Sequence, residues 1–300
     1  MLTSKLDVIN RLGRFLNNQK WLLLTNLHLN NLKVNQVLRS TNDSEIEKAQ
    51  TEVNNLSFSE KDYRDFVNSD VLSQYNQLDY IHSKPLEYLA TMTLLDLREG
   101  DEILDAAGGE EAEYIKALVA VSDFKLTAYC QDSLLDGKVT DGIKYIGGSI
   151  DAIPLPDESL DGISCHHSFE HFRDDLDIKF IKEAVRLLRV GRKLVIAPLF
   201  LTNEYAEIWN NKQIQKSNIE KAITIFDNTA TFAGWGAYEG FARTYSPAAF
   251  KTRIIDNLPS NCHAKIYKVL VDGKPVPDIK KNYHQPLLNA EMKVLVIVKS

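Results

Sequence analysis

The stretch "SCHHSFEHF", residues 164–172, gathers the side chains best suited to proton transfer. His166, His167 and His171 stand close together, with Glu170 among them. An imidazole, with an unperturbed pKa of about 6.5, can act as a general base near neutral pH. The pentad "HSFEH" also matches the zinc-binding pattern H-x-x-E-H. Because it follows a strand pattern instead of lying inside a helix, we do not expect it to hold a metal; histidines that serve packing alone are a third alternative.

A second candidate site is "ILDAAGGEEAEY", residues 103–114, where an apolar strand runs into Asp105, small residues and Gly109. Such a turn lets the backbone approach a ligand closely and aim N–H groups at it. Glu110 and Glu111 place negative charge where a pyrophosphate would lie, which argues against a dinucleotide. The stretch therefore fits a cationic or zwitterionic ligand, or it is an ordinary strand-to-helix turn.

Two further strand ends carry polar side chains. Asp132 closes the strand "KLTAYCQD" and can accept both hydroxyls of a ribose, although it could equally cap a short helix. In the loop "GGSID", Ser149 or Asp151 could accept from the amino group of an adenine, and Ile150 could pack on its face.

In this order the motifs resemble the class I S-adenosylmethionine-dependent methyltransferases, specifically the methyltransferase type 11 group, from about residue 85 to the C-terminus. The sequence departs from that pattern at Ala107 and Glu111, where glycine is usual, and at Ser149, where Asp is usual. Val190 and Arg192 replace a Pro and a Gly that shape the loop before a strand. The matching stretches are "LDAAGGE" (104–110), "YCQD" (129–132), "GSIDAIPLPDESLD" (148–161) and "LLRVGRKLVIAPLF" (187–200).

The resemblance implies S-adenosylmethionine as cofactor and methyl transfer to the oxygen or nitrogen of a small-molecule or glycan acceptor. If the acceptor is a hydroxyl, His167 is the first candidate for the general base because it ends a predicted strand, and His171 is the second, with Glu170 as orienting partner. The departures at the glycines and at Ser149 favour the alternative, a catalytically inactive binding or assembly protein of the same fold. The residues implied in cofactor binding are Asp105, Ala107, Gly109, Asp132, Ser149, Ile150, Asp151 and His166.

The elements that must position these residues alternate between strand and helix patterns. Apolar, β-branched strands separated by amphipathic helices predict a doubly wound α/β fold, whose ligands bind at the carboxyl ends of the strands. No helical run links the last two strands, so they should pair antiparallel. We thus expect a mostly parallel seven-stranded sheet with a C-terminal antiparallel hairpin. Strands are predicted over 101–108, 125–132, 143–148, 161–167, 193–200, 264–271 and 292–300, and helices over 84–97, 111–121, 177–189 and 246–258.

The chain divides into a helical N-terminal extension, residues 1–83, and a methyltransferase-like domain, residues 84–300. In the extension, apolar residues recur at helical spacing, and Ser44 followed by Glu47 predicts a capped helix over 44–56. The extension could pack on the domain or mediate a homodimer. Within the domain, an aromatic-rich insertion at 201–245 is where a lid or acceptor pocket belongs.

Composition narrows the class of protein. The chain has 300 residues, 44% hydrophobic content and a formal net charge of −6. This mild acidity gives no electrostatic reason to expect nucleic acid or an anionic membrane as partner. Three separated cysteines and the lack of a signal-peptide pattern favour a cytoplasmic protein.

Overall fold

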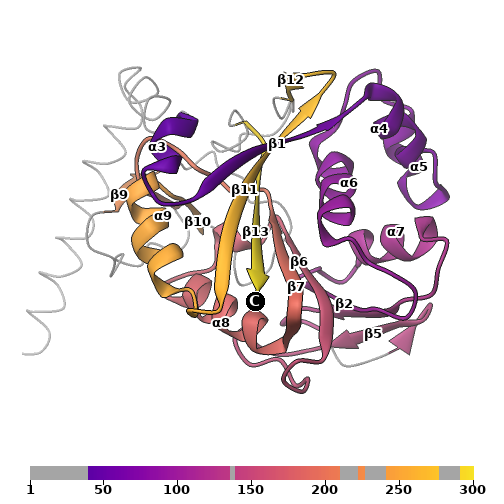
Figure 1. Ribbon diagram of the computed structural model, residues 1–300. Helices are drawn as coiled ribbons and strands as arrows, with labels where there is room; N and C mark the ends of the chain where they lie inside the picture. Colours follow the sequence, from indigo (N-terminus) through magenta and orange to yellow (C-terminus); the bar gives the residue numbers. More distant parts are fainter. Residues whose placement is uncertain (1–39, 136–138, 210–221, 227–240, 277–290) are drawn as a thin grey trace, which may run out of the picture.

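The computed structural model describes residues 40–135, 139–209, 222–226, 241–276 and 291–300, and the fold is built around one ten-stranded sheet (Figure 1). In spatial order its strands are β1 (Glu52–Phe58), β11 (Cys262–Val271), β13 (Lys293–Lys299), β7 (Leu188–Ala197), β6 (Leu160–His166), β2 (Glu102–Ala106), β3 (Thr127–Gln131), β5 (Ile143–Ile146) and β4 (Val139–Thr140), with β12 (Lys274–Pro275) paired to β11.

The central strands β7, β6, β2, β3 and β5 run parallel, and β13 lies antiparallel to both β7 and β11. This confirms the predicted doubly wound fold and its C-terminal antiparallel hairpin. All seven predicted strands are present. The sheet is nevertheless larger than predicted, because β1, β4 and β12 add to its margins.

Helices cover both faces of the sheet, so strand side chains are apolar in both directions. Along β13, Leu295 and Ile297 belong to one buried cluster, while Val294 and Val296 belong to the other. The first cluster lies under α8 (Leu176–Leu187) and α9 (Pro247–Arg253), and the second under α4 (Glu60–Val67), α6 (Ser83–Leu95) and α7 (Glu113–Val121). Helix α9 lies within the predicted range 246–258 and has Ser246 as N-cap and Pro247 in its first turn, and the 3₁₀ turn η4 (Ile255–Asn257) follows it.

The predicted helix over 44–56 is wrong in its second half. A short helix, α3 (Asp43–Glu47), is followed by β1, which pairs parallel to β11. Ser44 does not cap α3; a reciprocal capping box instead joins Ser59 and Asp62 at the start of α4. The backbone of β11 supplies the hydrogen bonds that make this segment a strand, and no local pattern contains that partner. The predicted helices of residues 1–39 and the homodimer lie outside the described residues, and the boundary at residue 83 stays a prediction.

The described part of the 201–245 insertion is a second, three-stranded sheet in the order β10 (Phe241–Thr244), β8 (Ala206–Trp209) and β9 (Ile223–Phe226). Tyr205, Trp209, Phe241 and Tyr245 are buried, as expected for rings that form local core. Three more aromatic residues of this segment, Phe232, Trp235 and Tyr238, lie outside the described residues, and so does the side chain of Phe226.

A buried ionic network joins this small sheet to the main domain. The Asp177 carboxylate on α8 pairs with Arg243 of β10 at 2.8 Å and with Arg253 of α9 at 2.6 Å, and it accepts from the Tyr245 hydroxyl at 2.7 Å. The side chains of Asp177 and Arg243 are fully buried. Each charge thus depends on its partners for the solvation that burial removes.

We predict that Asp177→Ala lowers the free energy of unfolding by about 3–5 kcal/mol, because it leaves the buried Arg243 guanidinium with only the more distant Glu207 carboxylate as ionic partner. Urea unfolding followed by circular dichroism measures this loss. Asp65→Ala is the control: it removes an exposed partner of Lys61 and should change stability by less than about 1 kcal/mol. Equal effects of the two variants would contradict the prediction.

Candidate functional site

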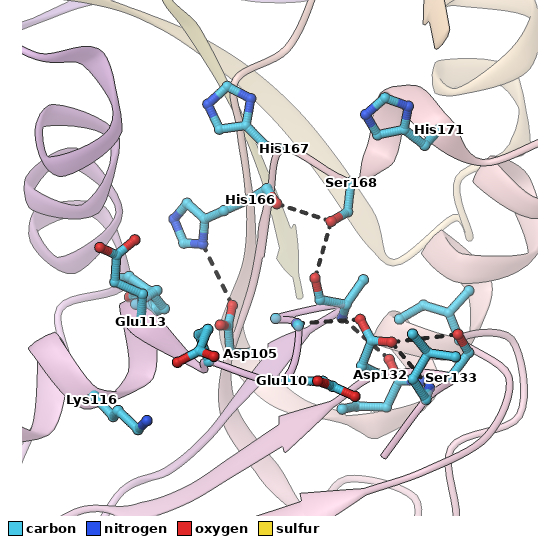
Figure 2. Close-up of a pocket in the computed structure, with 18 of the residues that line it drawn as sticks. Asp105, Glu110, Glu113, Lys116, Asp132, Ser133, His166, His167, Ser168 and His171 are labelled. Carbon is cyan, nitrogen blue, oxygen red and sulfur yellow. Dashed lines mark hydrogen bonds and ion pairs between the residues drawn. The ribbon is translucent and has the colours of Figure 1, made fainter. Parts of the chain in front are cut away.

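One pocket of about 890 Å³ lies at the carboxyl ends of β2, β3, β5 and β6 and is also lined by α6 and α7 (Figure 2). Its volume is in the range of sites for small ligands and cofactors. The sequence-predicted site residues that line it are Asp105, Ala107, Gly109, Asp132, Ser149, Ile150, His166, His167 and His171, whereas Asp151 and Glu170 are not among the lining residues.

The loop between β2 and α7 follows a glycine-like path at Ala107, one of the two positions where the usual glycine is replaced. Ala107 and Gly109 have φ of 53° and 71°, in the left-handed region where an alanine costs about 1–2 kcal/mol. A Cβ on Gly108 would lie 2.4 Å from Asp105 Oδ2 and 2.9 Å from Cys130 Sγ, so the loop packs too closely for a side chain there. The altered motif thus keeps the close backbone approach that a ligand needs.

Two side chains at the end of β3 hold the loops around the pocket together. Asp132 Oδ2 accepts from Gly109 N at 3.2 Å, and its Oδ1 accepts from Leu134 N at 3.1 Å. The buried amide of Gln131 accepts from Ala107 N at 3.2 Å and donates to Gly148 O at 2.7 Å. A carboxylate has about four acceptor positions, so Asp132 keeps capacity for ligand hydroxyls. Sequence reasoning missed Gln131, because nothing local distinguishes this glutamine from a surface one.

The loop after β5 forms an apolar wall with a polar rim. Ile150 is buried and lines the pocket. The hydroxyl of Ser149 donates to Asp151, which orients the serine although Asp151 itself is not a lining residue. Of the two predicted partners for an adenine amino group, the structure therefore places Ser149 at the pocket.

Asp105 and His166 form the floor of the pocket, and both are buried. Asp105 Oδ1 accepts from Ser164 Oγ at 2.9 Å and lies 3.5 Å from His166 Nδ1, while His166 Nε2 lies 2.9 Å from Thr91 Oγ1. Ser168 Oγ lies 3.0 Å from the carbonyl oxygens of both His166 and Ala107, which joins the end of β6 to the loop after β2.

His167 is held between two buried carboxylates. It follows β6 with a left-handed φ of 47°; its Nε2 lies 2.8 Å from Glu87 Oε2, and its Nδ1 lies 3.6 Å from Glu170 Oε1. Burial lowers the pKa of His167, but the charges and hydrogen bonds of Glu87 and Glu170 outweigh this and raise it from 6.5 to about 10. An imidazole that keeps its proton at neutral pH cannot accept one there, so this raised pKa argues against the prediction that His167 is the general base. Glu87 lies on α6, 80 residues from His167 in the sequence, so no local pattern indicates that the two side chains meet.

His171 lies in the 3₁₀ turn η2 (Phe169–His171), which follows β6 directly. Its Nδ1 is 2.6 Å from the carbonyl oxygen of Phe241, and its Nε2 is 3.6 Å from Glu170 Oε1. A carbonyl can only accept, so Nδ1 carries a proton and a neutral ring has its lone pair on Nε2. The placement of "HSFEH" at a strand end, outside a long helix, is confirmed. In the part of the chain that the structure describes, no group of three or more His, Cys, Asp or Glu side chains is arranged to hold a metal ion.

The pocket is acidic. Its lining contains five carboxylates, from Asp105, Glu110, Glu111, Glu113 and Asp132, and two lysines, Lys84 and Lys116. Burial raises the pKa of Glu113, but Lys84 and the hydroxyls of Tyr88 and Tyr75 outweigh it, so the net shift is downward. An excess of negative charge favours a ligand with a cationic centre over one rich in phosphate.

The chain matches one known protein family over part of its length. Residues 106–196 match the family model described as the methyltransferase domain of the type 11 group, which confirms the resemblance seen in the motifs. The comparison with curated proteins gave no match. No helix among the described residues is of a length and apolarity that would carry it across a bilayer.

Solved structures show partial likenesses. The YcgJ protein of Bacillus subtilis aligns at 18% identity and a TM-score of 0.31, over 38% of this chain and 51% of its own, so the chain spans about half its length. A SAM-dependent methyltransferase of Aquifex aeolicus aligns at 19% identity and a TM-score of 0.30, over 48% of this chain and 76% of its own. The third structure is the Haemonchus contortus phosphoethanolamine N-methyltransferase 2 in complex with phosphomonomethylethanolamine and S-adenosylhomocysteine. It aligns at 17% identity and a TM-score of 0.32, over 52% of this chain and 38% of its own.

We predict that His167 titrates with a midpoint near 10, measured by NMR of its ring resonances, and that Glu87→Gln lowers this midpoint because one of the two carboxylate charges is lost. A folded-state pKa raised above the unfolded value of about 6.5 gives stability that is fully present below pH 6.5 and is lost as pH rises through 10. The unfolding free energy should accordingly fall over this window, and less so in Glu87→Gln. A His167 midpoint near 6.5 in the parent would contradict the geometry described.

Proposed function

We propose that this chain, a class I methyltransferase by its fold and by the family match of residues 106–196, uses S-adenosylmethionine to methylate a small-molecule or glycan acceptor. The observation that carries the proposal is the pocket itself. Asp105 and Gly109 from the end of β2 and the loop after it, Asp132 after β3 and the loop after β5 come from three separate strand ends and line one cavity large enough for a cofactor and part of an acceptor.

The residues present fit this cofactor. S-adenosylmethionine supplies a methyl group already activated on a cationic sulfur, and it carries no phosphate, so an acidic lining suits it. Asp132 would accept from the ribose hydroxyls, and Ile150 would pack against the adenine. Glu110 and Glu111 are compatible with such a ligand and unfavourable to a dinucleotide. The left-handed Ala107 keeps the loop in a glycine-like path, which weakens the case for an inactive relative.

The protein would then have to align the acceptor atom with the methyl group and the sulfur of the cofactor. For a hydroxyl or protonated amine acceptor, it would also have to remove a proton. The acceptor side of the pocket is the wall that contains His167, His171 and Phe172. We assign the base to His171 in place of His167. The Phe241 carbonyl fixes its Nδ1 as a donor, and the Glu170 carboxylate, 3.6 Å from Nε2, would stabilise the imidazolium formed when that nitrogen takes a proton.

Asp132→Ala should bind S-adenosylmethionine roughly ten- to a hundred-fold more weakly than the parent, because it loses charged hydrogen bonds to the ribose. Isothermal titration calorimetry with S-adenosylmethionine and S-adenosylhomocysteine measures this. Asp123→Ala, which removes an exposed carboxylate that does not line the pocket, is the control and should bind like the parent. Parent protein that binds neither ligand would refute the proposal and favour a binding or assembly role.

His171→Ala should reduce methyl transfer roughly 100- to 10,000-fold, the usual contribution of a general base, while cofactor affinity stays within a few-fold. The assay follows a labelled methyl group from S-adenosylmethionine into small molecules and glycans of a cell extract. His167→Gln removes the neighbouring imidazole and should keep more of the activity than His171→Ala. Full transfer by His171→Ala would show that the reaction proceeds by alignment alone or with another base.

A further inference from the structure

Four side chains from residues 74–88 converge on the carboxylate of Glu113 at the start of α7. Gln74 Nε2 donates to it at 2.8 Å, the Tyr88 hydroxyl at 3.0 Å and the Tyr75 hydroxyl at 3.1 Å. The Lys84 ammonium completes the set with an ion pair to Oε2. Tyr75 and Gln74 belong to the short helix α5 (Ser73–Asn76), which follows the 3₁₀ turn η1 (Asp70–Leu72). This convergence fixes the position of the Lys84 ammonium.

Lys84 has donors to spare and faces the cofactor pocket. Its ammonium has three N–H groups, and the ion pair with Glu113 requires one of them. The Lys84 side chain is 37% exposed and lines the pocket, whereas the Glu113 side chain is 19% exposed and already accepts from several donors. Glu113 therefore acts as a support that holds a cation at the pocket wall.

The position of this cation matches one end of an extended ligand. Figure 2 shows Glu113 and Asp132 on opposite sides of Asp105. A nucleoside whose ribose contacts Asp132 would extend the remainder of the molecule toward Glu113. In S-adenosylmethionine that remainder ends in a carboxylate and an ammonium group. In a lining with five carboxylates, Lys84 and Lys116 are the two lysines that could form an ion pair with a ligand carboxylate.

We propose, on the basis of the proposed function, that Lys84 binds the carboxylate at the amino-acid end of the cofactor and that Glu113 positions it. The segment of residues 70–84 would then be one wall of the ligand site, since Val71, Gln74 and Lys84 line the same pocket. Val71 and Gln74, near the end of the N-terminal extension, would then belong to a ligand site that the sequence of the extension alone does not suggest.

The test compares two ligands that share the nucleoside and differ in the amino-acid end. S-adenosylhomocysteine has the carboxylate, and 5′-methylthioadenosine lacks the whole amino-acid end. In Lys84→Gln, calorimetry should show S-adenosylhomocysteine bound about tenfold more weakly, as for the loss of one charge-assisted hydrogen bond. The affinity for 5′-methylthioadenosine should stay within about twofold of the parent, which also shows that the variant is folded.

Lys116→Gln is the matched control, because it makes the same change of charge at the other lysine of the pocket and should affect both ligands little. The inference is overturned by unchanged S-adenosylhomocysteine binding in Lys84→Gln, by an equal loss for both ligands, or by a selective loss in Lys116→Gln. A parent that binds both ligands equally well contradicts this inference while leaving the proposed function intact. A parent that binds neither overturns the proposed function and this inference together.

Discussion

The structure depends on the parallel pairing of β7, β6, β2, β3 and β5. Parallel strands all end at the same edge of a sheet, so every loop that follows one of them reaches the same region of space. Each connection must return across a face of the sheet, and the helices that do so cover the apolar side chains on both faces. The pocket therefore forms where the loops converge, and the helices form the layers that shield the apolar strands from water.

Convergence alone does not fix the positions of the loops relative to one another. At the pocket, two polar side chains at the end of β3 hold the loops in place. The Gln131 amide contacts the loops after β2 and β5, and the Asp132 carboxylate joins the loop after β2 to the residues that follow β3. The bonds to Ala107 N, Gly109 N and Gly148 O satisfy partly buried backbone groups that would be costly to leave unpaired. The same polar groups that shape the pocket also present acceptors to a ligand, so the architecture of the site and its chemistry share the same residues.

Charge is distributed unevenly around this edge of the sheet. Ion pairs that lie deepest, such as Asp177 with Arg243 and Glu87 with His167, fix one element against another. Glu87 connects α6 to the end of β6 and keeps His167 protonated, and Glu170 contacts His167 and His171 in turn. The carboxylates at the pocket surface instead set the electrostatic potential that a ligand meets.

The sequence by itself determined the alternation of strands and helices, the acidic side chains at the strand ends and the closing hairpin. These features are local: period-two and helical patterns, turn residues and the Ser246–Pro247 helix start report the preferences of a few neighbouring residues. Only the tertiary structure decided that residues 52–58 form a strand, because their hydrogen-bond partner β11 begins about two hundred residues later. It also decided that His167 carries a proton, because a pKa depends on the charges and the solvent around a group, and Glu87 reaches that position through the fold alone.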